Sequence, residues 1–120
     1  MGAYLQLDLT NEVIVWVNRN VLDKKDRLRV KFNEFPEKEL FYSKIKFAKN
    51  KAKATIILSH NLPYNQIPGH VLAEVAKYLL YKQNEYKMVP LEMLTGKEWD
   101  QRFDKLATDW NDYIYRKLNS

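Results

Sequence analysis

The sequence predicts an α+β domain with an N-terminal helix, a three-stranded and mostly antiparallel sheet, a buried central helix and a long C-terminal helix. Three observations support this class: apolar residues at helical spacing near both ends, two segments that alternate between apolar and charged residues, and one apolar run. With 120 residues and no linker rich in Gly or Ser, the chain is expected to form a single domain over residues 1–120.

The first element is predicted from apolar spacing. Leu5, Leu9, Val13, Trp16 and Val17 recur at steps of three or four residues, which is typical of one face of a helix. The stretch 13–17 is rich in β-branched residues and therefore favours a strand by propensity. We give the spacing more weight and expect a helix.

Three strands are predicted next. Residues 27–33 alternate between apolar and basic side chains, and residues 41–49 repeat that pattern, so each is expected to be a half-buried strand. Residues 54–58 are apolar on both faces, which is typical of an interior strand. Asn50 and the lysines around it indicate a turn between the second and third strands.

The rest of the chain is predicted to be helical. Pro68 suits the first turn of a helix, and residues 71–81 present a broad apolar surface on good helix formers, so this helix is expected to be buried. A short segment over residues 91–94 ends near Gly96. From Lys97 onward, apolar residues recur at helical spacing to the C-terminus, which predicts a long amphipathic helix.

The composition excludes several chemistries. The chain has no cysteine, which excludes disulfides, thiolate nucleophiles and Cys-ligated metals, and only three glycines, which excludes a Gly-rich phosphate cradle. No apolar run approaches the ~20 residues of a membrane span, and the N-terminus does not have the layout of a secretory signal. We expect a cytoplasmic protein that has no cofactor and no membrane contact.

The net charge of +5 is concentrated in one part of the chain. Residues 1–39 hold seven cations and seven anions, and residues 74–120 hold eight of each. The excess lies in residues 40–73, which contain no acidic residue and five lysines: Lys44, Lys46, Lys49, Lys51 and Lys53. Such a local positive field attracts anionic partners. The alternative is that these lysines only keep the edge of a sheet from aggregating.

The alternating segments suggest how a binding surface would form. If residues 27–33 pair with residues 41–49 as a basic β-hairpin, their cations share one sheet face, and the lysine-rich turn extends it. Tyr42 on that face would stack on a base. The predicted partner is nucleic acid, either DNA or RNA, or an acidic protein surface. The predicted contact residues are Arg27, Arg29, Lys31, Tyr42, Lys44, Lys46, Lys49, Lys51 and Lys53.

The residues that usually carry catalysis are sparse. His60 and His70 match no compact metal-ligand spacing, and no acidic residue lies near either of them before Glu74. Ser59 precedes His60, but adjacency in sequence does not supply the third group and oxyanion site that a nucleophile needs. The aspartates of the C-terminal segment are interleaved with Lys and Arg, which is typical of a solvated helix face. We therefore predict no catalytic residue and no metal site.

One stretch resembles a known family. Residues 55–59, a loop with a leucine and a proline, and the helical residues 71–78 resemble the SprT-like (Spartan) metalloprotease domain. In that family the helix carries a His-Glu-x-x-His motif, whose frame falls here on Ala73-Glu74-Val75-Ala76-Lys77. The family's third zinc ligand opens a later helix, and Thr95-Gly96-Lys97-Glu98-Trp99 resembles that stretch with Thr in the ligand's place.

The resemblance implies a minimal zincin scaffold without its chemistry. The glutamate of the motif is present as Glu74, but Ala73, Lys77 and Thr95 stand where the zinc ligands would be. Without these ligands the resemblance implies a pseudoenzyme. It also implies contact with DNA or with protein bound to DNA, because the family acts on such substrates.

A second hypothesis is a small regulator or inhibitor, of the kind found in phages and mobile elements, that acts by protein-protein contact. Its anchors would be aromatic residues of the C-terminal segment, since Trp and Tyr are enriched at binding hot spots. The same residues would also line a core. They are Trp99, Phe103, Trp110, Tyr113 and Tyr115.

Overall fold

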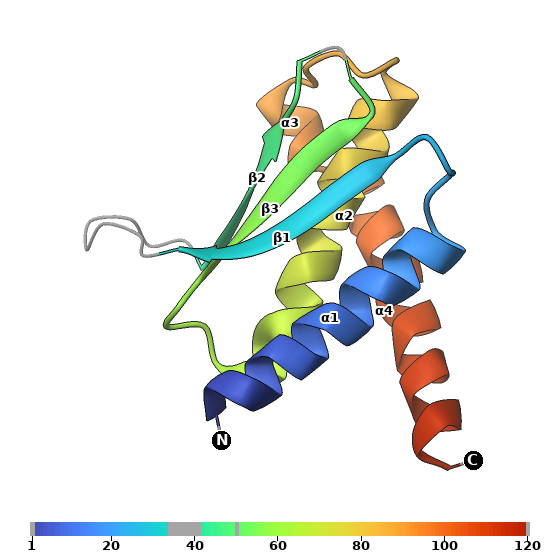
Figure 1. Ribbon diagram of the computed structural model, residues 1–120. Coiled ribbons are helices and arrows are strands. Elements are labelled where there is room, and N and C mark those ends of the chain that lie inside the picture. The colour runs from blue at the N-terminus through green and yellow to red at the C-terminus, as the bar shows by residue number, and fades with distance from the viewer. Residues whose placement is uncertain (1, 34–41, 50, 120) are drawn as a thin grey trace.

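The computed structural model describes residues 2–33, 42–49 and 51–119, which form a sheet with helices packed against one of its faces (Figure 1). This arrangement confirms the predicted α+β class and the predicted order of elements. The elements are α1 (Gly2–Asn20), β1 (Arg27–Asn33), β2 (Ser43–Phe47), β3 (Lys53–Ser59), a 3₁₀ turn (Tyr64–Gln66), α2 (Ile67–Gln83), α3 (Leu91–Leu94) and α4 (Lys97–Leu118). None of the described helices combines the length and apolarity that a membrane crossing requires.

The sheet is mixed, with the strand order β1-β3-β2. β1 runs parallel to β3 and β2 runs antiparallel to it, so one of the two ladders differs from the expected antiparallel pattern. The expected pairing of residues 27–33 with residues 41–49 is wrong, because β3 lies between the two strands. The reason is burial. β3 has buried apolar side chains on both faces, with Ile56 and Leu58 on one face and Ile57 on the other, and it therefore takes the central position.

α1 shows burial prevailing over local propensity. Val13 and Val17 are fully buried and Trp16 is 6% exposed, whereas Val15, on the other side of the helix, is 39% exposed. Burying such a side chain contributes about 1.5–3 kcal/mol, while a β-branched residue in a helix costs only about 0.5 kcal/mol. The helical spacing of the buried residues therefore decides the structure of this segment.

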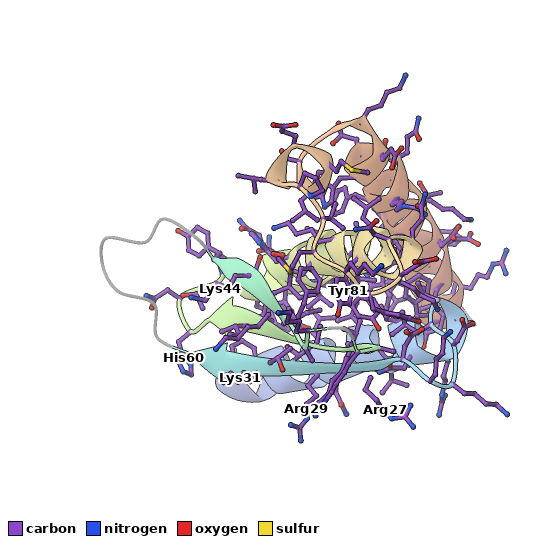
Figure 2. The ribbon with its side chains drawn as sticks, turned by 90° about the horizontal axis from the view of Figure 1, so that it is seen from above. Arg27, Arg29, Lys31, Lys44, His60 and Tyr81 are labelled. Carbon is purple, nitrogen blue, oxygen red and sulfur yellow. The ribbon has the colours of Figure 1, made fainter. Side chains whose placement is uncertain are left out.

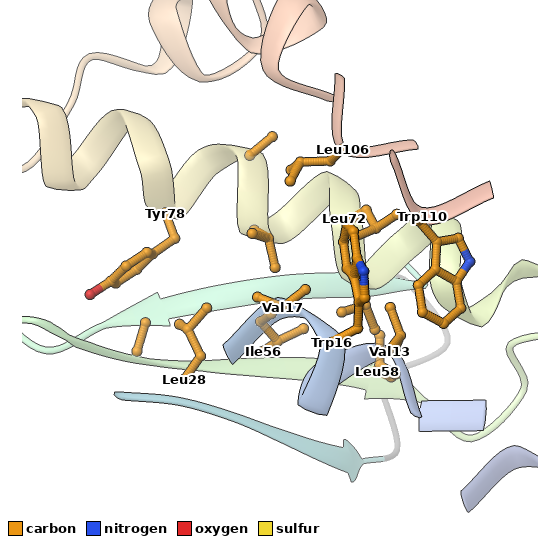
Figure 3. Packing of buried hydrophobic residues seen from close by; sticks show 14 of the residues in the cluster. Val13, Trp16, Val17, Leu28, Ile56, Leu58, Leu72, Tyr78, Leu106 and Trp110 are labelled. Carbon is orange, nitrogen blue, oxygen red and sulfur yellow. The ribbon is translucent and has the colours of Figure 1, made fainter. Parts of the chain in front are cut away.

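α2 is the central element of the core. On one side it packs against the sheet, where Ile56 and Leu58 point inward, and on the other it packs against Leu106 and Trp110 of α4 (Figure 3). α1 joins the same cluster through Trp16, whose ring lies 5.6 Å from that of Trp110 in an edge-to-face arrangement. This explains why α2 is apolar over most of its surface.

A buried carboxylate ties the loop before β1 to α2. Asp26 is 3% exposed, and its Oδ1 accepts a hydrogen bond from the Tyr78 hydroxyl at 2.7 Å. Its Oδ2 accepts hydrogen bonds from the Lys82 ammonium at 2.6 Å and from the backbone N–H of Asp23 at 3.0 Å. Burial alone would raise the pKa of Asp26, but the hydrogen bonds from Lys82 and Tyr78 outweigh that effect and hold its pKa below the ordinary value.

We predict that Asp26→Asn lowers the free energy of unfolding by about 2 kcal/mol at neutral pH, because it removes the charge that Lys82 and Tyr78 bond to. The unfolded-state pKa is near 3.8 and the folded-state pKa is lower, so the carboxylate stabilises the fold fully above pH 3.8. This stabilisation is lost as the pH falls through the folded-state pKa. Urea unfolding at pH 7 and pH 2.5 measures both effects.

The matched control is Asp23→Asn, which makes the same change of charge at a side chain that is 68% exposed. We expect it to cost less than about 0.5 kcal/mol. A destabilisation by Asp26→Asn that stays the same at both pH values would contradict the assigned role of the carboxylate.

Candidate functional site

The predicted cations meet on the outer face of the sheet, the face opposite the helices. In the observed register Arg29 and Lys46 flank Thr55 from the two sides, and Arg27 lies beside Lys53. Paired residues point to the same face of a sheet. We define the basic face by its six cations: Arg27, Arg29, Lys31, Lys44, Lys46 and Lys53.

The basic face is turned toward solvent. Figure 2 shows Arg27 and Arg29 on the side of the sheet away from α2, and all six cations are exposed. Cations on one strand are two residues apart, or about 6.6 Å, and β1 lies about 10 Å from β2 across β3. The face is therefore an open array of positive charge and not a pocket.

Few of these cations are neutralised. Among the described residues, no carboxylate pairs with Arg29, Lys31, Lys46 or Lys53. The Arg27 guanidinium donates to backbone carbonyl oxygens of Lys24 and Asp26, the second at 3.0 Å, and keeps its charge. The basic face thus retains most of its positive field for an external anion.

One apolar residue lies among these charges. Ile57 of the central strand points to the outer face, yet it is only 5% exposed. Its neighbours across the two ladders are Lys31 and Lys44. Lysine stems cover apolar surface while their ammonium groups stay in water, and neighbours on adjacent strands are about 5 Å apart. We therefore infer that the aliphatic stems of these two lysines pack on the side chain of Ile57.

Two further predicted cations, Lys49 and Lys51, lie in the turn between β2 and β3 and are exposed. Tyr81 of α2, which is fully buried, holds this turn (Figure 2). Its hydroxyl donates to the Ala48 carbonyl oxygen at 2.6 Å and accepts a hydrogen bond from the Lys51 backbone N–H at 3.3 Å. Its ring stacks on Phe47 with centroids 4.4 Å apart. The lysine turn is thus fixed to the core.

Tyr42 takes a different place from the lysines. Its ring meets the ring of His70 of α2 edge to face at 6.0 Å, at the β2 edge of the sheet. The Ser43 hydroxyl and His70 Nδ1 are 3.0 Å apart, and burial lowers the pKa of His70. The structure thus pairs Tyr42 with His70 at this edge, and Tyr42 is still 47% exposed. His60 is exposed and stacks on Phe32, with ring centroids 5.9 Å apart.

The frame of the SprT-like resemblance lies on α2. Glu74 is 1% exposed, its Oε1 accepts a hydrogen bond from the Lys77 ammonium at 3.0 Å, and its Oε2 is buried with no described partner. Burial raises the pKa of Glu74 more than Lys77 lowers it. Ala73 offers its carbonyl oxygen to the indole N–H of Trp99 at 3.0 Å, so α4 lies against the frame.

The stretch that would hold the third ligand has local structural roles. The Thr95 hydroxyl donates to the Leu91 carbonyl oxygen at 3.2 Å, at the C-terminal end of α3. A Cβ at Gly96 would lie 2.8 Å from the Glu92 carbonyl oxygen, so the junction of α3 and α4 requires glycine. Within the described part of the chain, no group of three His, Cys, Asp or Glu residues is placed to hold a metal ion.

The aromatic residues of α4 mostly belong to the core. Trp110 is 5% exposed, and Trp99, Phe103 and Tyr113 are half-buried against the core cluster. Tyr115 is 68% exposed. Four of the five proposed anchors of a protein-protein contact are therefore explained by packing of α4 on the rest of the fold.

Comparison with known proteins gives no match to a family model, a curated protein or a solved structure. The SprT-like resemblance therefore stays a prediction, and the function is argued from the site.

Sequence reasoning missed two parts of this site. In the sequence, Tyr81 is one more residue of a buried helix. The role of its hydroxyl is evident only in the structure, where the turn between β2 and β3 lies beside it. The signal that was present is the amphipathic nature of Tyr: a buried tyrosine usually has a partner for its hydroxyl. The position of Lys53 on the outer face was also missed, because it was assigned to the turn.

We predict that Tyr81→Phe lowers the free energy of unfolding by about 1 kcal/mol and loosens the lysine turn, because the Ala48 carbonyl oxygen and the Lys51 backbone N–H lose the buried hydroxyl and keep only the hydrogen bond between them, at 3.0 Å. Hydrogen exchange of the Lys51 amide, followed by NMR, should become faster than in the wild type. Tyr115→Phe removes an exposed hydroxyl and serves as the control with no expected effect. An unchanged Lys51 exchange rate in Tyr81→Phe would refute the anchoring role.

Proposed function

We propose that this chain is a non-catalytic binding protein that holds nucleic acid, DNA or RNA, on the basic face by contacts to the phosphate backbone. One observation carries the proposal: the register of three strands aligns six cations on one helix-free face, and no described carboxylate neutralises Arg29, Lys31, Lys46 or Lys53. Phosphate contacts supply most of the affinity of non-specific nucleic-acid binding.

Protection of sheet edges explains only part of this charge. Lysines on β1 and β2 do discourage pairing with other sheets, since both are edge strands. Lys53, however, belongs to β3, which has a neighbour on each side. Lys49 and Lys51 lie in a turn that Tyr81 holds in place. A surface that spans the centre and one end of the sheet fits a binding role better than edge protection alone.

The chemistry of the basic face favours backbone contact over recognition of bases. Between its cations, β3 presents Thr55 and Ile57 to the outer face, and no aromatic ring points outward from the described strand residues. Single-strand binders stack bases on such rings. We therefore infer that duplex is bound at least as tightly as single strands, with little dependence on sequence.

We further propose that the scaffold is a degenerate SprT-like domain. Two observations support the idea: Glu74 is buried at the position of the motif's glutamate, and Trp99 donates a hydrogen bond to Ala73, which brings the start of α4 against the frame. The side chains at the ligand positions, those of Ala73, Lys77 and Thr95, are not zinc ligands. We infer that such a domain has lost the hydrolytic activity of the family and has retained its contact with nucleic acid.

Fluorescence anisotropy with a labelled 20-base-pair duplex tests the proposed function. Six phosphate contacts predict a slope of log affinity against log salt of about −5, and hence about a thousandfold loss between 50 and 200 mM NaCl. The double variant Arg29→Glu/Lys46→Glu should bind at least tenfold more weakly at 50 mM NaCl, with a slope shallower by about 2.

The control is Lys97→Glu/Lys105→Glu, which makes the same change in net charge at two exposed residues of α4, a helix that packs on α2 and α3, and should keep wild-type affinity. An equal loss in both double variants would show that only net charge matters. Affinity indifferent to salt, or binding to polyglutamate with none to the duplex, would contradict the proposal and favour an acidic protein partner.

A further inference from the structure

A groove runs along the β1 edge of the sheet, between β1 and α1. Its volume is about 500 Å³, and α1 contributes Asn11, Ile14 and Asn18 to its wall. Figure 1 shows β1 as the outermost strand, with α1 running beside it in the opposite direction. We call this feature the β1 groove. Its other wall includes Leu28, Val30 and Phe32.

The groove lies beside backbone groups that are available for pairing. Among the described strands, β1 pairs with β3 alone. The Arg27 N–H donates to the Ala52 carbonyl oxygen at 2.8 Å, so the backbone groups of Arg27, and of every second residue after it, point toward β3. The intervening residues direct their N–H and C=O groups to the open edge. These are Leu28, Val30 and Phe32.

The dimensions fit an extended peptide. From Asn11 to Asn18 the helix rises about 11 Å, and from Leu28 to Phe32 the strand spans about 13 Å. The groove therefore matches four or five residues of an added strand. Such addition to an open sheet edge is a recurring mode of peptide recognition, in which main-chain hydrogen bonds give affinity and side-chain pockets give specificity.

The charge of β1 selects the side chains of the added strand. Residues of the peptide that point to the outer face would lie next to Arg29 and Lys31, so acidic side chains are favoured there. The alternate residues would point to the inner side, over Ile14 and beside Val30, where apolar side chains are favoured. The occupant is thus a strand that alternates between acidic and apolar residues.

The same charge argues against a second copy of this chain as the occupant. If β1 paired antiparallel with β1 of another copy, so that the outer faces of both sheets lay on the same side, the outward residues of one strand would face the outward residues of the other in any register. Those residues are Arg27, Arg29 and Lys31. Like charges placed directly opposite each other destabilise a strand pair, which is how edge strands commonly avoid self-association.

We propose that the β1 groove binds an extended peptide with alternating acidic and apolar side chains, which adds to the sheet as a fourth strand beside β1. This site goes beyond the proposed function. It depends on the open edge and the groove, whereas nucleic-acid binding depends on the outer face as a whole.

The probe is a capped seven-residue peptide of alternating Glu and Val, with Glu at both ends. On saturation we expect the amides of Leu28, Val30 and Phe32 to exchange with solvent at least tenfold more slowly by NMR, because they become hydrogen-bonded to the peptide. A peptide of the same composition with its four Glu followed by its three Val should bind at least tenfold more weakly.

Two variants test the geometry. Val30→Pro removes one N–H from the open edge, a position where an edge strand tolerates proline, and should weaken peptide binding about tenfold. Asn18→Trp fills the groove from an exposed helix position and should weaken binding by at least as much. Arg19→Trp, at the neighbouring exposed position outside the groove wall, is the control. Circular dichroism confirms that each variant is folded.

The outcomes are distinct. Equal affinity for the two peptides, or unchanged exchange at Leu28, Val30 and Phe32, would overturn strand addition. Protection of these amides that grows with protein concentration alone would show that a second copy is the occupant. Val30→Pro should leave affinity for duplex DNA unchanged, so failure of this proposal and failure of the proposed function give different results.

Discussion

The fold depends on one constraint, which is that the third strand is apolar on both faces. Ile56 and Leu58 must be covered from one side and Ile57 from the other. Only the centre of the sheet, with α2 packed beneath it, meets that requirement, so β1 and β2 become the two edges. The positions of α1 and α4 follow, because both pack on α2 and complete the core around Trp16 and Trp110.

The basic face is a consequence of this central strand. β1 and β2 are not neighbours, but each is in register with β3, so their outward residues point the same way. The apolar Ile57 then lies between Lys31 and Lys44. The lysine turn between β2 and β3 lies beside Tyr81, whose hydroxyl fixes this turn to α2. The same packing that stabilises the sheet therefore also determines where its positive charge lies.

Periodicity predicted the helices and strands because burial of one face leaves a regular pattern in the chain. It predicted α1 even though Val13 to Val17 favour a strand, since the buried stripe contributes more than propensity. The apolar residues on both faces of β3 already indicated its central position, and the expected pairing of residues 27–33 with residues 41–49 disregarded that signal. The parallel direction of β1 relative to β3 was not predictable, because alternation within a strand carries no information about the direction of its neighbour. The Asp26 network was also missed: in sequence Asp26 is one charge in a polar loop, and its partners Tyr78 and Lys82 lie more than fifty residues away.

The two proposed sites share β1 and the charges of Arg29 and Lys31, and yet they depend on different groups of the strand. Along a strand, side chains alternate between the two faces and backbone groups alternate between the two edges, both with a period of two residues. In β1 the residues that carry charge outward, such as Arg29, bond their backbone to β3, and the residues that point inward, such as Val30, offer theirs to the open edge. Charge on the face and pairing at the edge are therefore separable by mutation within one strand. An acidic strand at the edge would still reduce the field of Arg29 and Lys31, which makes the two ligands competitors.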